Sequence, residues 1–411
     1  MAVSLAFHII FAIIGIAMPV LMVVAERRWQ RTRDPVYLDL AKRWSRGTAI
    51  LFAVGAVSGT VLSFELGLLW PRFMELAGPL IGMPFSLEGF AFFTEAIFLG
   101  VYLYGWDRVS PRAHLLAGVL VAVSGALSGI FVVIANAWMN TPTGFTVVNG
   151  MITNVDPIAA MQTPAAFPQA LHMTLAAYAA TGLGVAGIHA LLLLWNRTSA
   201  FNRAALGIGL LVGAPAAVLQ PISGDIAARY VARRQPVKLA AMEAVYETQA
   251  GAPLKLIPGV EIPRALSLLA FHDPNAVVQG LDSVPREDWP NVGLVHFSFT
   301  LMVLLGTYMA VISLWAGWHA LRKHDFATRR RLLWALVVAA PCGFIATEAG
   351  WMVTELGRQP WVIYGVLRTA DAVTPMPGLI VPFVAITLLY CALGFIVGRV
   401  LYTQIIRSPS A

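Results

Sequence analysis

Apolar residues form nine long runs along the chain, separated by shorter polar segments. Each run is long enough to cross the roughly 30 Å of hydrocarbon in a bilayer as a helix of about 20 residues. Only helices satisfy their own backbone hydrogen bonds in lipid at this length, so the pattern predicts a bundle of nine transmembrane helices. The predicted spans are residues 2–25, 47–68, 87–105, 115–137, 167–195, 205–222, 294–314, 332–354 and 378–401.

Composition supports an all-α integral membrane protein. The 411 residues are 58% hydrophobic and only 12% charged, with a mean hydropathy of +0.73, which leaves too little polar surface to cover a water-soluble globule. The first apolar run has no basic segment before it and is followed by arginines, so we expect it to remain as an anchor. The net charge of +7 requires no nucleic-acid partner, because basic residues gather on cytoplasmic loops.

Loop charges predict the orientation of the bundle. Arginine and lysine concentrate in residues 26–46 and 322–331, whereas residues 138–166 contain neither. The positive-inside rule then places the N-terminus outside and the C-terminus in the cytoplasm. We therefore divide the chain into spans one to six (1–222), a long extracytoplasmic segment (223–290) with a helix at 237–248, and spans seven to nine with the GRQPW motif (291–411).

Ligand-capable or ionisable side chains inside spans are costly in lipid and are therefore functional candidates. Seven such residues are expected in the outer half of the membrane: His8, Glu88, Glu95, His172, His296, Met302 and Glu355. A single histidine there could equally be an interfacial hydrogen-bonding residue, and a single methionine could be core. We assign structural roles to the other histidines and to His296; these residues are His114, His189, His272, His296, His319 and His324.

The acidic candidates also have two interpretations each. Glu88 and Glu95 are two helical turns apart and share one face, as a hydrogen-bonded pair or as a proton relay beside a metal or haem. Glu355 could pair with Arg358 at the headgroup level, or it could bind ferric iron while Arg358 pairs with a haem propionate. Cys342 and Cys391 fall inside spans, where we expect buried thiols without a disulfide.

Six stretches together resemble subunit I of the cytochrome bd-type quinol oxidases. They follow the order of that family through nearly the whole chain, and the first two are the most specific. The stretches are GWMVTELGRQPW (350–361), GDIAARYVARRQPVKLAAMEAVYET (224–248), SLEGFAFFTEAIFLG (86–100), NAWMNTPTGF (136–145), LHMTLAAYAATG (171–182) and HFSFTLMV (296–303).

The resemblance implies three haems and a ligand for each. His172 and Met302 are similar to the axial pair of a low-spin haem b. His8 and Glu355 resemble the ligands of two high-spin haems, one a haem b and the other a haem d or a further haem b; which residue holds haem d is left open. Trp351 and Arg358 correspond to residues that support the haem at Glu355.

The resemblance also implies the substrates and the partners. Lys238 and Glu243 match quinol-binding residues, and Glu88 and Glu95 match carboxylates that deliver protons to the site of oxygen reduction. The expected enzyme oxidises quinol at the outer face of the bacterial inner membrane and reduces O2 to water. Its expected partners are membrane lipid, a second multi-span subunit (subunit II) and, optionally, a small single-span subunit.

One departure from the family pattern concerns the low-spin haem. The family commonly has an arginine two residues before the methionine ligand, and this chain has Thr300. A missing cation would leave a haem propionate less neutralised and lower the potential of that haem.

Two other functions stay open from the residues alone. An ion transporter would use Glu88, Glu95 and Glu355 as its path, although the chain lacks the paired repeats typical of transporters. A haem-bearing quinone oxidoreductase without oxygen chemistry would need only His172 and Met302.

Overall fold

The computed structural model describes residues 1–148, 151–195, 199–257 and 260–405, and in these ranges it contains nine helices long and apolar enough to span a membrane. The fold class predicted from the sequence is therefore confirmed. The nine helices are α1 (Ala2–Thr32), α2 (Pro35–Leu69), α3 (Pro71–Tyr104), α4 (Pro111–Asn140), α6 (Ala166–Leu194), α7 (Ala200–Arg234), α10 (Val292–Leu321), α11 (Arg330–Leu356) and α13 (Ile380–Ile405).

Short elements fill the connections between these helices. The short helices are α5 (Pro157–Met161), α8 (Pro236–Glu243), α9 (Ala265–Phe271) and α12 (Thr369–Ala372). The strands form four antiparallel pairs: β1 (Thr146–Val148) with β2 (Met151–Thr153), β3 (Gln249–Ala250) with β6 (Val277–Val278), β4 (Leu254–Ile257) with β5 (Val260–Ile262), and β7 (Trp361–Ile363) with β8 (Leu367–Arg368).

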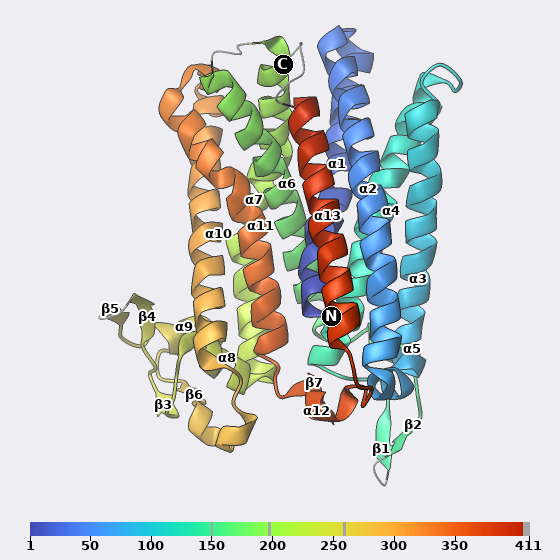
Figure 1. The fold of residues 1–411 in the computed structure, drawn as a ribbon. Helices are drawn as coiled ribbons and strands as arrows, with labels where there is room; N and C mark the ends of the chain where they lie inside the picture. Colours follow the sequence, from blue (N-terminus) through green and yellow to red (C-terminus); the bar gives the residue numbers. More distant parts are fainter. Residues whose placement is uncertain (149–150, 196–198, 258–259, 406–411) are drawn as a thin grey trace.

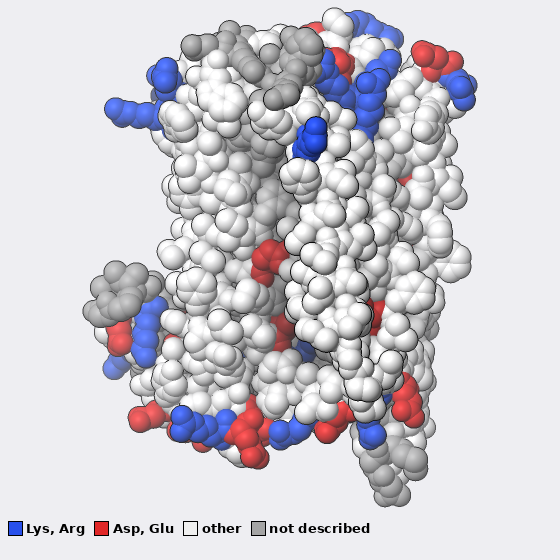
Figure 2. Space-filling view, viewed as in Figure 1, with Lys and Arg blue, Asp and Glu red and all other residues white. Residues whose placement is uncertain are grey.

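The helices run roughly parallel to one another, and the connections differ at the two ends of the bundle (Figure 1). At the upper end in Figure 1 the connections are short; we call this the basic end, and it includes the turns at 33–34 and 105–110. At the opposite end, which we call the loop end, lie α5, α8, α9, α12 and all the strands. Charged atoms gather at both ends and are sparse along the visible side wall (Figure 2), as expected for a lipid-facing surface.

Local sequence signals explain where several helices begin. Asp34 accepts a hydrogen bond from the Val36 amide at the start of α2, and Ser110 does the same for Ala113 in α4. Proline follows each of these caps, where its missing N–H costs nothing and its fixed φ favours the first helical turn. The cap at Asp34 lets α2 begin at Pro35 rather than at residue 47. Helix α3 also starts well before its apolar run, at Pro71 rather than residue 87, with proline in its first turn but no side-chain cap.

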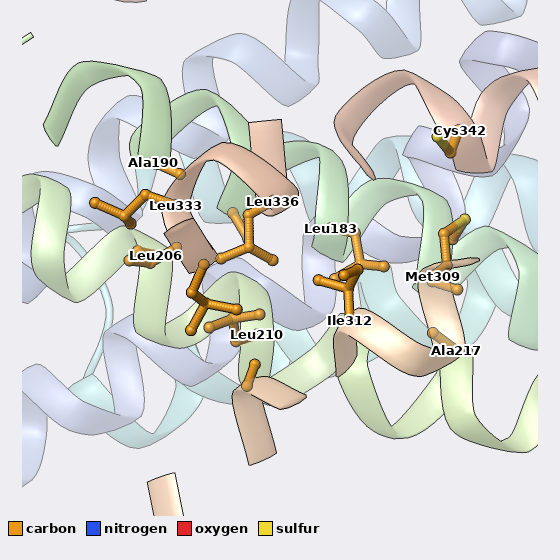
Figure 3. Packing of buried hydrophobic residues seen from close by; sticks show 14 of the residues in the cluster. Leu183, Ala190, Leu206, Leu210, Ala217, Met309, Ile312, Leu333, Leu336 and Cys342 are labelled. Atoms are coloured by element: carbon orange, nitrogen blue, oxygen red, sulfur yellow. The ribbon is translucent and has the colours of Figure 1, made fainter. Parts of the chain in front are cut away.

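The largest apolar core lies where α6, α7, α10 and α11 meet. Leu183, Leu206, Ile312 and Leu336 are buried in this cluster (Figure 3). Gly182 of α6 and Gly213 of α7 allow the two backbones to touch, because a Cβ added at Gly182 would lie 2.5 Å from the Gly213 backbone. Small residues at a crossing favour close packing of helices in lipid, where no hydrophobic effect drives association.

Three expectations from the sequence need correction. The helix predicted at 237–248 ends at Glu243, because Ala244 adopts a left-handed conformation (φ 50°) that caps it. Cys391 is exposed rather than buried, since α13 lies at the periphery of the bundle, whereas Cys342 is buried as expected. Glu95 does not share the end of the bundle at which most of the other candidates lie: α3 begins at Pro71 and ends at Tyr104, so Glu95 is closer to the basic end and Glu88 lies near the middle.

The glycine contact between α6 and α7 gives a test of the packing. We expect Gly182→Ala to lower the free energy of unfolding by about 1–3 kcal/mol, because its Cβ would meet rigid backbone atoms of Gly213 and Gly209. Denaturation midpoints in detergent micelles would measure the change. Gly207→Ala in α7 is the matched control, since its Cβ would meet nothing within 4 Å. Equal midpoints for the two variants would contradict this account of the crossing.

Candidate functional site

The loop end brings together most of the candidate residues predicted from the sequence. His8 lies in the first turns of α1, His172 in the first turns of α6, and Met302 in the third turn of α10. Glu355 and Trp351 lie in the last turns of α11, and α8, which carries Lys238 and Glu243, is found at the same end. Glu88 and Glu95 are the exceptions and lie deeper along α3.

His8 and His172 are held by the same arrangement of side chains. Nδ1 of His8 lies 2.9 Å from Oγ of Ser58 in α2, and Nδ1 of His172 lies 2.9 Å from Oγ of Ser223 in α7. Each serine hydroxyl donates its own proton to a backbone carbonyl one helical turn earlier, at Val54 and Gln220. The serine oxygens therefore accept from the Nδ1–H groups.

This hydrogen bond fixes which ring nitrogen can bind a metal. With Nδ1 protonated, the lone pair of each imidazole is on Nε2, which is the tautomer required for a ligand. The Gln220 amide nitrogen lies 3.2 Å from Nε2 and 3.3 Å from Nδ1 of His172 and donates to the His172 carbonyl, so it packs against the face of the ring and not in line with the Nε2 lone pair. Sequence reasoning missed Ser58 and Ser223; the available signal was a polar residue inside predicted span 47–68 and another directly after predicted span 205–222.

Glycine lies against three of the four candidate ligands. An added Cβ at Gly59 would lie 3.0 Å from the His8 ring, one at Gly224 would lie 3.4 Å from the His172 ring, and one at Gly350 would lie 3.0 Å from Met302 Sδ. Side chains are thus absent where a planar macrocycle would need room. The donor set fits haem, because imidazole, thioether and carboxylate all serve as axial ligands of protein-bound iron.

Glu355 belongs to a partly buried polar cluster. Its Oε1 accepts a 2.6 Å hydrogen bond from Asn136 Nδ2 of α4, and its Oε2 accepts a 2.6 Å ion-pair bond from Arg358 Nη2. Arg358 is 1% exposed, and its other terminal nitrogen, Nη1, is buried without a hydrogen-bond partner in the described part of the chain. Burial lowers the pKa of Arg358, and Glu355 opposes this. A buried guanidinium with a free N–H suits an anionic group such as a propionate.

The two ionisable residues of α8 point in different directions. Five positions separate Lys238 and Glu243, which is about 140° around a helix. Lys238 Nζ donates to Asn140 Oδ1 of α4 at 2.6 Å. Burial and repulsion from Arg358 lower the pKa of Lys238 to about 7, against the attraction of Glu355. Burial raises the pKa of Glu243 to about 7, against the attraction of Lys255.

A second contact holds α8 against α10. His296 Nδ1 donates to the Met242 carbonyl at 2.7 Å, which gives His296 the structural role expected from the sequence. Since His296 and Met302 lie on the same helix, this bond ties α8 to the helix that carries the candidate thioether ligand.

The two deeper acids of α3 both lie against α4. Glu88 accepts a hydrogen bond from Ser128 of α4 at 3.1 Å, and Glu95, 4% exposed, lies against Gly125, where an added Cβ would approach its carboxylate to 3.1 Å. Sequence reasoning also missed Glu348, seven residues before Glu355 on the same face of α11. Its Oε1 is buried and has no partner among the described residues.

The structure thus defines a class: a multi-span membrane protein with imidazole, thioether and carboxylate side chains, all candidate metal ligands, on four helices near one end of the bundle. The chain belongs to the family described as cytochrome bd terminal oxidase subunit I, whose sequence profile matches residues 1–409. It is therefore a membrane-embedded subunit of a terminal oxidase from a bacterial respiratory family, and the family implies haem cofactors and a second subunit.

Relatives in two bacterial species cover most of the chain. A putative cytochrome bd menaquinol oxidase subunit I from Bacillus subtilis is 36% identical, and the match covers 99% of this chain and 95% of the relative. A cytochrome bd ubiquinol oxidase subunit 1 from the same organism is 30% identical, covering 94% and 88%. The cytochrome bd-II ubiquinol oxidase subunit 1 of Escherichia coli is 27% identical, covering 90% and 88%.

A solved structure shares the fold. The bd oxidase from Geobacillus thermodenitrificans superimposes with a TM-score of 0.93 at 37% sequence identity, covering 99% of this chain and 97% of the other.

The serine–histidine pairs give a second test. We expect Ser223→Ala and Ser58→Ala to weaken haem retention by about 10–100-fold, the usual effect of losing a group that orients a ligand. Haem content and the visible spectrum of the purified protein would measure this. Ser63→Ala is the matched control in α2, because Ser63 is exposed and its hydroxyl donates to the Gly59 carbonyl of its own helix. Unchanged haem content in both variants would show that the serines do not orient ligands.

Proposed function

We propose that this chain oxidises quinol at its loop end and passes the electrons through a low-spin haem b to two high-spin haems, where O2 is reduced to water. His172 and Met302 would hold the low-spin haem b. His8 and Glu355 would each hold a high-spin haem, one a haem b and the other a haem d or a further haem b. When bound, the haems carry the electrons and supply the oxygen-reducing iron.

One observation carries the quinol half of this proposal. Helix α8 is buried at the loop end and carries two ionisable side chains with pKa values near 7, where groups that exchange protons work best. Hydrogen bonds to α4 and α10 hold this helix beside Glu355 and the helix of Met302. Glu243 would accept a quinol proton, and Lys238 would hydrogen-bond a headgroup oxygen.

The proposed topology makes the reaction electrogenic. The loop end faces outward, with the N-terminus outside and the C-terminus cytoplasmic, so quinol protons leave on the outside. Glu95 and Glu88 lie between the basic end and the candidate haem ligands and would deliver protons taken from the cytoplasm. Charge separation then builds a gradient without a pump. A multi-span subunit II, a small single-span subunit and lipid complete the proposed assembly in the inner membrane.

A reduced-minus-oxidised visible spectrum tests the haem assignment. We expect low-spin and high-spin features together, and we expect Met302→Leu to remove the low-spin band because leucine offers no ligand atom. A low-spin band without high-spin features would instead indicate a quinone oxidoreductase, and a colourless protein would favour an ion transporter. A low-spin band that survives in Met302→Leu would refute this ligand.

The pKa of Glu243 predicts a pH dependence. The carboxyl is neutral below about pH 7 and ionised above it, and only the ionised form accepts a proton. Quinol turnover should therefore rise with pH through about 7, by up to about tenfold per unit on the acid side. Lys255, which interacts with Glu243, and His296, which bonds the adjacent Met242, are the charged or titratable neighbours of this site.

Glu243→Gln should remove this rise, because an amide cannot take the proton. Glu247→Gln is the control, since Glu247 is an exposed carboxylate on the same segment. A pH–rate profile in Glu243→Gln that matches the unaltered chain would exclude Glu243 as the proton acceptor.

A further inference from the structure

A continuous chain of hydrogen bonds joins α8 to the Glu355 carboxylate. Lys238 Nζ donates to Asn140 Oδ1 (2.6 Å), Asn140 Nδ2 donates to Asn136 Oδ1 (3.1 Å), and Asn136 Nδ2 donates to Glu355 Oε1 (2.6 Å). Asn140 Nδ2 also donates to the backbone carbonyl of Asn136, at 3.0 Å. Two side chains of α4 thus bridge a helix of the loop end and a carboxylate of α11.

The ends of this chain fix the direction of every bond within it. In its protonated form Lys238 can only donate, and an ionised carboxylate can only accept. Asn140 must therefore turn its oxygen to Lys238 and its nitrogen to Asn136, and Asn136 must turn its nitrogen to Glu355. All three donors point the same way, so each bond polarises the next.

The chain is shielded from water where it begins. Lys238 is 3% exposed and Asn140 is 1% exposed. Gln235 Nε2 donates to the Asn140 carbonyl at 2.6 Å and holds this residue in place from the start of α8. In such a low-dielectric setting, a change in the hydrogen-bond partner of Lys238 alters the strength of the next hydrogen bonds in the series, because water does not screen it.

We propose that Asn140 is a positioning residue that couples quinol occupancy at α8 to the hydrogen bonding of Glu355. This inference rests on the proposed roles of Lys238 and Glu355. A headgroup oxygen that takes a hydrogen bond from Lys238 competes with Asn140 Oδ1 for the ammonium. The Asn140 amide is then less polarised, Asn136 donates more weakly, and Glu355 Oε1 becomes a more basic ligand atom. No covalent bond forms or breaks in this response.

The test uses the complete haem-loaded oxidase and a quinol analogue that cannot be oxidised. Analogue binding is measured by calorimetry, and the visible spectrum of the high-spin haems is recorded with and without it. We expect the analogue to shift this spectrum in the unaltered enzyme. In Asn140→Leu, which has a similar size but no hydrogen-bonding groups, the analogue should still bind, within about tenfold of its original affinity, and the shift should be lost.

Asn140→Asp keeps an acceptor for Lys238 and removes the donor to Asn136, so it breaks the chain at one link with almost no change of shape. We expect the shift to be lost in this variant as well, which protects the test if the leucine variant fails to fold. Tyr230→Phe is the matched control, because it deletes a 2.9 Å bond to Thr141, the next residue along the chain, without touching the four linked side chains. It should retain the full shift.

Two results would overturn the coupling while the proposed function stands: a shift that persists in both Asn140 variants, or a bound analogue that shifts nothing in the unaltered, haem-loaded enzyme. A shift lost equally in Tyr230→Phe would also overturn it, since any disturbance of the end of α4 would then suffice. An enzyme without high-spin haem bands, or one that binds no analogue, would instead refute the proposed function and this inference with it.

Discussion

Lipid offers no hydrogen-bond partners, and this constraint organises the polar side chains of the whole bundle. A polar group inside the membrane must find its partner within the protein, because an unsatisfied one costs several kcal/mol. The histidines meet this demand with serines from neighbouring helices, and Glu355 meets it with Asn136 and Arg358. Each partner also selects a tautomer or orients a candidate ligand atom. The same hydrogen bonds therefore satisfy the buried polar groups and set the geometry of the site.

The placement of the site follows from the same constraint. The candidate ligands lie near the loop end of α1, α6, α10 and α11, where connecting segments supply additional polar groups. Helix α8 illustrates this: it lies outside the spans, yet Lys238 and Glu243 are buried against the bundle, which brings their pKa values close to neutrality. A surface helix with the same sequence would leave both groups fully charged at pH 7.

Periodicity and hydropathy were sufficient to predict the nine spans, since a helix that crosses a membrane needs about 20 predominantly apolar residues, and such a run is visible in a single sequence. They could not predict where the helices end, because Asp34–Pro35 and Ser110–Pro111 extend the helices through polar residues that carry no hydropathy signal. Glu95 lies nearer the basic end than expected because α3 begins at Pro71 rather than at residue 87. The sequence singled out the candidate ligands but not the residues that hydrogen-bond to them or link them, which are Ser58, Ser223, Asn136 and Asn140. Whether two side chains on different helices meet depends on how each helix is rotated about its axis. The pattern of apolar residues indicates only which face of a helix can face lipid, and it does not identify the partner helix.

The two serine–histidine pairs have a consequence for assembly. Ser58 and His8 belong to consecutive helices, α1 and α2, and Ser223 and His172 belong to another consecutive couple, α6 and α7. Each imidazole is therefore oriented within a single helical hairpin, as soon as that hairpin has entered the bilayer during synthesis. Met302 and Glu355, on α10 and α11, emerge from the ribosome later. The order of residues along the chain thus lets the two histidines proposed as haem ligands be oriented before the helices of Met302 and Glu355 are made.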